Sequence, residues 1–109
     1  MKLETADEKE YNGILTLDVF QRKNEIVIKS AIAGVKGKDL DIAITKDSVT
    51  IAGQREEEEK DEGKNYFYQE LHWGGFSRKV ILPEEVNPDK AKATLKNGIL
   101  TITMPKKLS

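Results

Sequence analysis

The sequence predicts an all-β domain, built as an antiparallel β-sandwich or barrel. Short runs of alternating apolar and polar residues recur along the chain, and glycine, proline and asparagine separate them at close spacing. No segment shows the 3.6-residue period of an amphipathic helix. Eight runs fit within 109 residues, which is the length of one domain.

The clearest element is a β-hairpin centred on Asn97-Gly98. Both residues of this pair accept positive φ, so they suit a two-residue type I′ turn, whose twist matches that of the flanking strands. Pro105 has no N–H to donate to a sheet and ends the second strand. Apolar residues alternate on both sides of the turn: Ala91, Ala93 and Leu95 before it, and Leu100, Ile102 and Met104 after it.

The other elements follow from the same alternation. Residues 1–13 are polar and acidic, so we expect a short flexible N-terminal arm, a domain at 14–106 and a short, truncated tail at 107–109. The first strand is predicted at 15–20, where Leu15, Leu17 and Val19 alternate with polar residues. Further strands are predicted at 26–32, 40–45, 49–53, 66–69, 76–82 and 90–96, ahead of the last strand at 100–104.

Two packed sheets bury the inward-facing residues of their strands. The predicted core consists of Leu17, Val19, Ile26, Ile28, Ile42, Val49, Ile51, Phe76, Val80, Leu82, Leu100 and Ile102.

Residues 54–64 cannot supply a core face, because most of them are charged and four consecutive glutamates occupy 56–59. Like charges in a run repel each other and stay solvated, which favours a long surface loop over a binding role. The carboxylates lack the spacing of a calcium loop.

Charge and cysteine content exclude several classes of protein. Lys and Arg total 18 and Asp and Glu total 19, a net charge of −1 that argues against nucleic acid or a membrane as the main partner. The chain has no cysteine, hence no disulfide framework. No apolar run reaches the roughly 20 residues of a transmembrane helix, and no signal peptide is evident, so we expect a cytoplasmic protein.

No catalytic constellation is evident. His72 is the only histidine, which excludes two-histidine metal motifs, and no Gly-x-Ser-x-Gly elbow or phosphate-binding glycine loop is present. Tyr66, Phe67, Tyr68 and Trp73 could stack nucleobases, but the neighbouring acidic run would repel phosphates. We therefore expect no enzyme activity, cofactor, metal or small-molecule substrate, and a protein-binding role remains.

Two motifs resemble one protein family. Residues 93–100, Ala-Thr-Leu-Lys-Asn-Gly-Ile-Leu, resemble the signature of the α-crystallin domain of small heat-shock proteins, with Ala93, Asn97, Gly98 and Leu100 at the characteristic positions. Residues 75–83 resemble the strand that precedes this signature. The resemblance covers about residues 15–106 and implies an immunoglobulin-like two-sheet sandwich. It also implies a stress-response chaperone that holds partly unfolded client proteins without ATP and suppresses their aggregation.

The resemblance implies a peptide groove. In relatives, an Ile-x-Ile or Ile-x-Val segment of a tail lies between the strands that correspond to 40–45 and 90–96. The residues that would line this groove are Ile42, Ile44, Ala91, Ala93 and Leu95. Ile42 and Leu95 could equally be ordinary core residues.

The resemblance also implies a homodimer. In bacterial, archaeal and plant relatives, a strand on the long loop pairs with the first strand of a partner, whereas metazoan relatives use an elongated strand and have no long loop. The long acidic insert favours the exchanging type. The exchange would pair Tyr66, Phe67, Tyr68 and Gln69 with Leu15, Leu17, Val19 and Phe20 of the partner.

The sequence departs from the family pattern in three places. It has no Ile-x-Ile segment at its end, its N-terminal arm is short, and Ala33-Gly34 stands where relatives often have Leu-Pro-Gly. A dimer is therefore expected instead of a large shell. Three alternatives remain open: a co-chaperone-like or scaffold sandwich without holdase activity, a structural or adhesion sandwich, and an enzyme.

Overall fold

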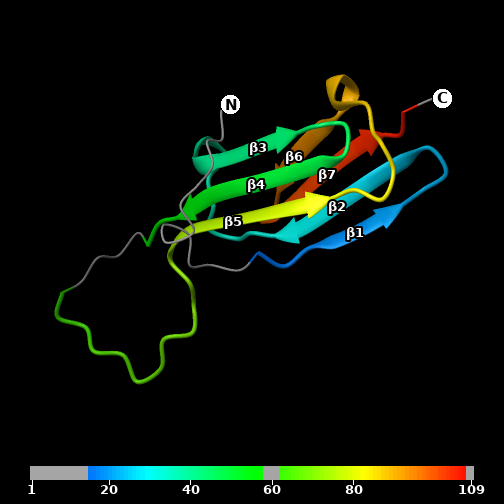
Figure 1. The fold of residues 1–109 in the computed structure, drawn as a ribbon. Helices are drawn as coiled ribbons and strands as arrows, with labels where there is room; N and C mark the ends of the chain where they lie inside the picture. Colours follow the sequence, from blue (N-terminus) through cyan, green and yellow to red (C-terminus); the bar gives the residue numbers. More distant parts are fainter. Residues whose placement is uncertain (1–14, 58–61, 108–109) are drawn as a thin grey trace.

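The computed structural model describes residues 15–57 and 62–107, and within these ranges the chain is an all-β sandwich (Figure 1). Two three-residue 3₁₀ helices, η2 at Gly37–Asp39 and η3 at Pro88–Lys90, are the helical elements of the described part. The strands are β1 (Asp18–Gln21), β2 (Glu25–Ala31), β3 (Leu40–Ile44), β4 (Ser48–Arg55), β5 (Gly74–Ile81), β6 (Lys92–Lys96) and β7 (Ile99–Pro105). The prediction of an all-β sandwich is confirmed.

The strands form two antiparallel sheets that pack face to face. One sheet has four strands in the order β1-β2-β7-β6, and the other has three in the order β3-β4-β5 (Figure 1). The edge strand β5 is tied to the segment that leads into β1, because Nη1 of Arg78 donates a hydrogen bond to the carbonyl of Leu15 at 2.7 Å. The edge strands β3 and β6 lie on the opposite side of the sandwich.

The β6–β7 hairpin has the predicted turn. Asn97 has φ 53° and Gly98 has φ 77°, both positive as a type I′ turn requires. The pairing of Lys96 with Ile99 closes the hairpin. The Gly98 carbonyl also accepts a hydrogen bond from the N–H of Ile32 at 2.7 Å, so the turn is fixed to the end of β2.

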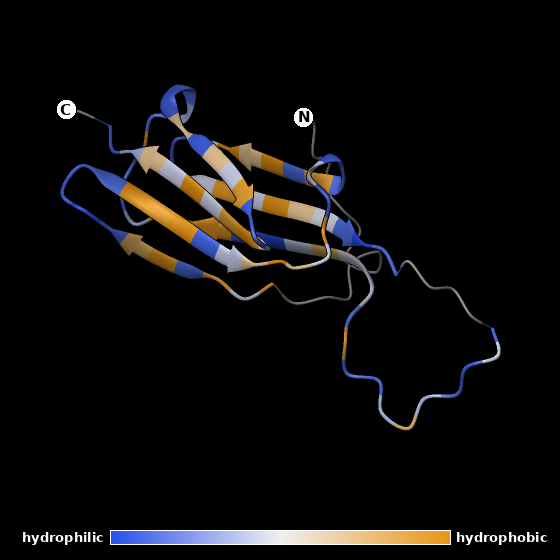
Figure 2. Ribbon diagram, turned by 180° about the vertical axis from the view of Figure 1, so that it is seen from behind, coloured by the Kyte–Doolittle hydropathy of each residue, from blue (hydrophilic) through white to orange (hydrophobic). Residues whose placement is uncertain are grey.

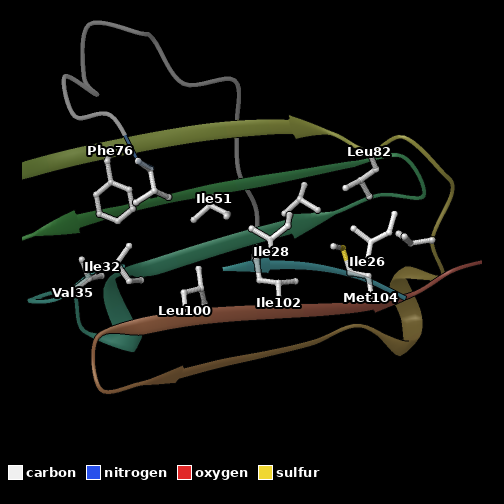
Figure 3. Packing of buried hydrophobic residues seen from close by; sticks show 13 residues of the cluster. Ile26, Ile28, Ile32, Val35, Ile51, Phe76, Leu82, Leu100, Ile102 and Met104 are labelled. Atoms are coloured by element: carbon white, nitrogen blue, oxygen red, sulfur yellow. The ribbon is translucent and has the colours of Figure 1, made fainter. Parts of the chain in front are cut away.

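The core lies between the inner faces of the two sheets (Figure 3). Hydrophilic and hydrophobic bands follow one another along most strands, while the segment between β4 and β5 is mostly hydrophilic (Figure 2). The core residues are Leu15, Ile26, Ile28, Ile32, Val35, Val49, Ile51, Phe76, Leu82, Val86, Leu100, Ile102 and Met104.

The predicted core needs one correction and several additions. Val19 is 43% exposed, although its pairing with Ile28 turns it inward. It lies on the edge strand of a four-stranded sheet, and the facing sheet of three strands does not reach over it. Three other predicted core residues are only partly buried against the core: Leu17, Ile42 and Val80. The buried hydrophobic residues that the prediction omitted are Leu15, Val27, Ile32, Val35, Ala52, Val86 and Met104.

Two predicted strands differ from the structure. The first strand begins at Asp18 and not at Leu15, because the pairing with β2 starts with Asp18 opposite Lys29. Leu15 is buried in the core ahead of the strand. Residues 66–69 are not a strand in the single chain, since no described strand pairs with them. Seven strands thus form in the described residues where eight were predicted.

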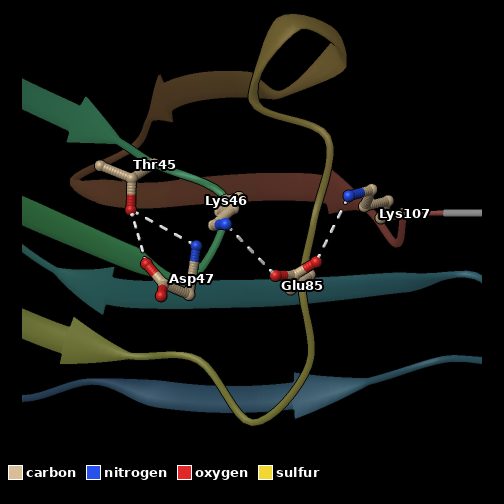
Figure 4. Close-up of polar contacts among 5 residues, drawn as sticks. All are labelled: Thr45, Lys46, Asp47, Glu85 and Lys107. Carbon is tan, nitrogen blue, oxygen red and sulfur yellow. Dashed lines mark hydrogen bonds and ion pairs between the residues drawn. The ribbon is translucent and has the colours of Figure 1, made fainter.

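The connection between β5 and β6 fastens the end of β7 by backbone and side-chain contacts. Glu85 lies between Lys46 of the β3–β4 turn and Lys107, at 3.8 and 3.5 Å (Figure 4). The same turn is closed by the Thr45 hydroxyl, which donates to the Asp47 carboxylate at 3.1 Å (Figure 4). These exposed ion pairs add little stability. The chain after β7 is held by the backbone, where the N–H of Lys107 donates to the Glu85 carbonyl at 2.9 Å.

Gly53 is a position where a side chain does not fit. A Cβ atom there would lie 2.6 Å from the carbonyl oxygen of Asp39 and 2.9 Å from the ring of Phe76. We expect Gly53→Ala to lower the free energy of unfolding by about 1–3 kcal/mol, the typical cost of overpacking. Chemical denaturation measures this change. Gly37→Ala is the matched control, since a Cβ at Gly37 meets no atom within 4 Å, and an equal loss in both variants would contradict the packing argument.

Candidate protein-interaction site

The inner faces of the edge strands β3 and β6 form the first candidate surface. Residues paired directly across an antiparallel sheet lie on the same face. Ile42 pairs with Ile51 and Ile44 with Val49, and both partners are fully buried. The side chains of Ile42 and Ile44 therefore point between the sheets.

β6 presents the matching face on the other sheet. Ala93 pairs with Ile102 and Leu95 with Leu100, and both partners are buried in the core. Ala91 precedes β6 and caps η3, where its N–H donates to the Pro88 carbonyl at 3.2 Å. The predicted groove residues thus come together along two neighbouring edges, which we call the β3/β6 edge.

The residues of the β3/β6 edge are neither free nor fully buried. Ile42, Ile44, Ala91 and Leu95 are half-buried and pack against the core. Ala93 is exposed even though its pairing with the buried Ile102 turns it inward. Each strand has one unpaired backbone edge in the described chain, which an extended peptide can use for hydrogen bonds.

The second candidate surface combines the free edge of β1 with an aromatic segment of the long loop. Val19 is 43% and Phe20 36% exposed, and the Arg22 guanidinium lies 5.3 Å from the centroid of the Phe20 ring. In the loop, Phe67 is 99% and Tyr68 85% exposed. The structure leaves these apolar groups uncovered and does not bring the two segments together within one chain.

Leu15 and Leu17 differ from the other predicted dimer residues. Leu15 is buried and Leu17 packs against the core, so neither offers an exposed side chain to a partner. Gln69 is exposed, and Tyr66 is half-exposed under the ammonium of Lys64. The pKa of the Lys64 ammonium group is raised, mostly by its hydrogen bond with Glu57 and to a smaller extent by its hydrogen bond with Tyr66.

The described residues lack the geometry that a metal site requires. No group of three His, Cys, Asp or Glu side chains in residues 15–57 and 62–107 could hold a metal ion. The side chain of His72 is held by a local contact, in which Nε2 lies 2.9 Å from the Gly75 carbonyl oxygen. No helix in these ranges is long and apolar enough to cross a membrane.

Sequence reasoning did not identify two arginines that connect distant segments. Arg78 joins β5 to Leu15, and Arg55 reaches the carbonyl of His72 at 3.4 Å. Arginines in or beside predicted strands give no sequence signal for such contacts, because the acceptors are backbone carbonyls of other segments.

Comparison with known proteins gives one consistent result. A family model described as the Hsp20/alpha crystallin family matches residues 18–109. Spore protein SP21 of Stigmatella aurantiaca is 39% identical over 90 residues, which are 83% of this chain and 53% of that protein. Small heat shock protein C2 of Rickettsia felis is 38% identical over 102 residues, 94% of this chain and 66% of that protein. The chain spans about half to two thirds of the length of these relatives.

The fold agrees with solved structures of similar proteins. Heat shock protein 16.0 from Schizosaccharomyces pombe superimposes with a TM-score of 0.75 at 32% sequence identity, covering 84% of this chain and 86% of that one. The fold of that protein is therefore the fold of this chain.

Proposed function

Because the chain belongs to the Hsp20/alpha crystallin family, whose small heat-shock proteins are generally chaperones, we propose that it is an ATP-independent holdase. It binds partly unfolded client proteins in the cytoplasm as a homodimer and slows their aggregation. The observation that carries this proposal is the β3/β6 edge, where half-buried apolar side chains lie beside unpaired strand edges.

The physical chemistry of holding requires no nucleotide. A partly unfolded client exposes apolar surface and unpaired strand segments, and these cause aggregation. A rigid sandwich can cover such a segment by strand addition, with main-chain hydrogen bonds for affinity and a shallow apolar face for side chains. Charged side chains are 34% of the chain, and they keep the complex dispersed in water.

Light scattering from a heat-stressed model client tests the holdase proposal directly. We expect the protein, added without ATP at an equimolar to few-fold excess, to slow the rise in scattering. An inert protein of the same size at the same concentration is the control. If a folded and correctly assembled protein leaves the scattering curve unchanged, the holdase proposal is wrong, and a scaffold or partner-docking role takes its place.

The β3/β6 edge is the proposed site for an extended apolar segment such as Ile-x-Ile. We expect such a peptide to bind weakly, because a short flexible peptide loses conformational freedom on binding. Ala93→Trp should abolish this binding, since the indole would fill the space that the alanine leaves beside Ile102. Thr94→Trp is the matched control, because Thr94 pairs with Thr101 on the outer face of the same strand.

Peptide titration followed by heteronuclear NMR measures this effect and locates it. Peptide-induced shifts in the wild-type protein should centre on β3 and β6 and should persist in Thr94→Trp. If the peptide bound folded Ala93→Trp as tightly as the wild-type protein, its binding site would lie elsewhere on the surface.

A further inference from the structure

A mainly apolar pocket of about 390 Å³ lies at the end of the sandwich, at the root of the long loop. This volume is within the range of small-molecule binding sites. None of its residues belongs to the β3/β6 edge, so it is separate from the proposed peptide site. The pocket is lined by Ala31, Ala33, Gly34, Arg55, Leu71 and Trp73.

Arg55 is the one charged residue among those that line the pocket. It is the last residue of β4, and its Cγ and Cδ lie 3.5 Å from the position that a Cβ of Gly34 would occupy. The aliphatic part of the side chain therefore lies across this glycine. Gly34 has φ +86°, a conformation in which a side chain is strained, so the backbone favours a residue without a Cβ under Arg55.

The guanidinium group of Arg55 has few partners in the described part of the chain. Nη1 donates to the His72 carbonyl at 3.4 Å, the long limit of a hydrogen bond. Nε is buried and has no hydrogen-bond partner, and none of the ion pairs between described residues involves this side chain. A guanidinium has five N–H donors, and a buried donor without an acceptor is unfavourable.

We propose that this pocket binds a carboxylate carried on an aliphatic group, of the kind found at the C-terminal residue of a peptide that ends in leucine. The two oxygens of a carboxylate match the planar fork of a guanidinium, so a carboxylate is a strong, charge-assisted acceptor for this side chain. The alanines, Leu71 and Trp73 provide apolar walls for the aliphatic group. One cation matches one negative charge, and the His72 carbonyl together with the acidic run that begins at Glu56 disfavours a dianion such as phosphate.

The protein has a built-in reporter for this binding. Trp73 lines the pocket and is the only tryptophan in the chain, so its fluorescence responds to an occupant of this site. The probes are N-acetyl-leucine, which has a free carboxylate, and N-acetyl-leucinamide, its neutral analogue of the same shape. We expect the acid to change the fluorescence with saturation at a Kd on the order of millimolar, as suits so small a ligand. The amide should bind at least about tenfold more weakly, because it cannot form charge-assisted hydrogen bonds.

Two variants of the full chain test the role of the guanidinium. Arg55→Met keeps an unbranched side chain without the charge and should weaken binding of the acid at least about tenfold. Lys79→Met is the control, since Lys79 is exposed on β5 and does not line the pocket, and its affinity should equal that of the wild-type protein. Circular dichroism establishes that both variants fold, and if Arg55→Met does not fold, the comparison of acid with amide decides the question.

Several results would overturn the proposal. They are equal affinity for the acid and the amide, an unchanged affinity in folded Arg55→Met, and no saturable change in fluorescence at constant ionic strength. An apparent Kd that rises with protein concentration would also overturn it, because a carboxylate of a second copy would then be the occupant. None of these outcomes depends on whether the protein holds unfolded clients.

Discussion

Deletion of residues 56–69 is expected to convert a dimer into a monomer while the sandwich stays folded. The proposed dimer pairs the segment 66–69 of each chain with the free edge of β1 in its partner. Exposed Phe67 and Tyr68 on the loop and exposed Val19 and Phe20 on β1 are the apolar groups that such a contact would cover. Pairing across a two-fold axis would give hydrogen-bond partners to the backbone of both segments in each of the two chains, in one isologous interface.

The geometry of the loop makes this deletion structurally acceptable. Arg55 and Gly74 are paired neighbours at the ends of β4 and β5, so the deletion leaves the four residues 70–73 to connect them. Four-residue hairpin connections are common. The monomer should therefore keep the β-sheet spectrum of the intact protein.

Native mass measurement or sedimentation at micromolar concentration distinguishes the assembly states. A specific interface of this kind should bury at least about 1,000 Å² in total, enough to hold the dimer at that concentration. The point variant Tyr68→Pro should also weaken the dimer, because proline removes one N–H from the exchanged strand. Tyr68→Ala keeps this N–H and is its control. A monomeric intact chain, or a dimer that is indifferent to the deletion, would rule out strand exchange.

Truncation of Ile102 to alanine is expected to cause the largest loss of stability of any single change considered. Ile102 is fully buried at the centre of β7, where it faces Ile28 across the sheet. Removing three carbons from such a site costs about 2–5 kcal/mol, since the lost burial is compounded by a cavity. A change of this size lowers the melting temperature of a domain of this length by about 10 °C or more.

Ile81→Ala is the matched control for this prediction, because the same atoms are removed. Ile81 is 71% exposed at the end of β5, so we expect a change within about 0.5 kcal/mol. Both variants must be compared at one protein concentration, since dimer formation adds to apparent stability. Similar losses at the two positions would contradict the assignment of the core.

The sequence alone determined the features that depend on local chemistry. Asn97-Gly98 specified the type I′ turn because few residues adopt positive φ at both positions, and Pro105 ended the following strand. The alternation of apolar residues in β7 assigned Leu100, Ile102 and Met104 to one face, and all three are buried. Such signals act within a few residues, so they are legible without knowledge of the rest of the chain.

Only the tertiary structure decided which inward-facing residues are buried. Val19 and Ile28 face the same way, but Val19 lies at an edge that the three-stranded sheet does not cover, and it stays exposed. Val35 and Val86 belong to connections with no periodic pattern, and they are buried because the chain crosses the ends of the core at these points. The side chain of Arg55 likewise meets Gly34 and the His72 carbonyl only after β2, β4 and β5 have assembled. Burial depends on the number and order of strands in both sheets, a property of the whole chain that no local run of residues encodes.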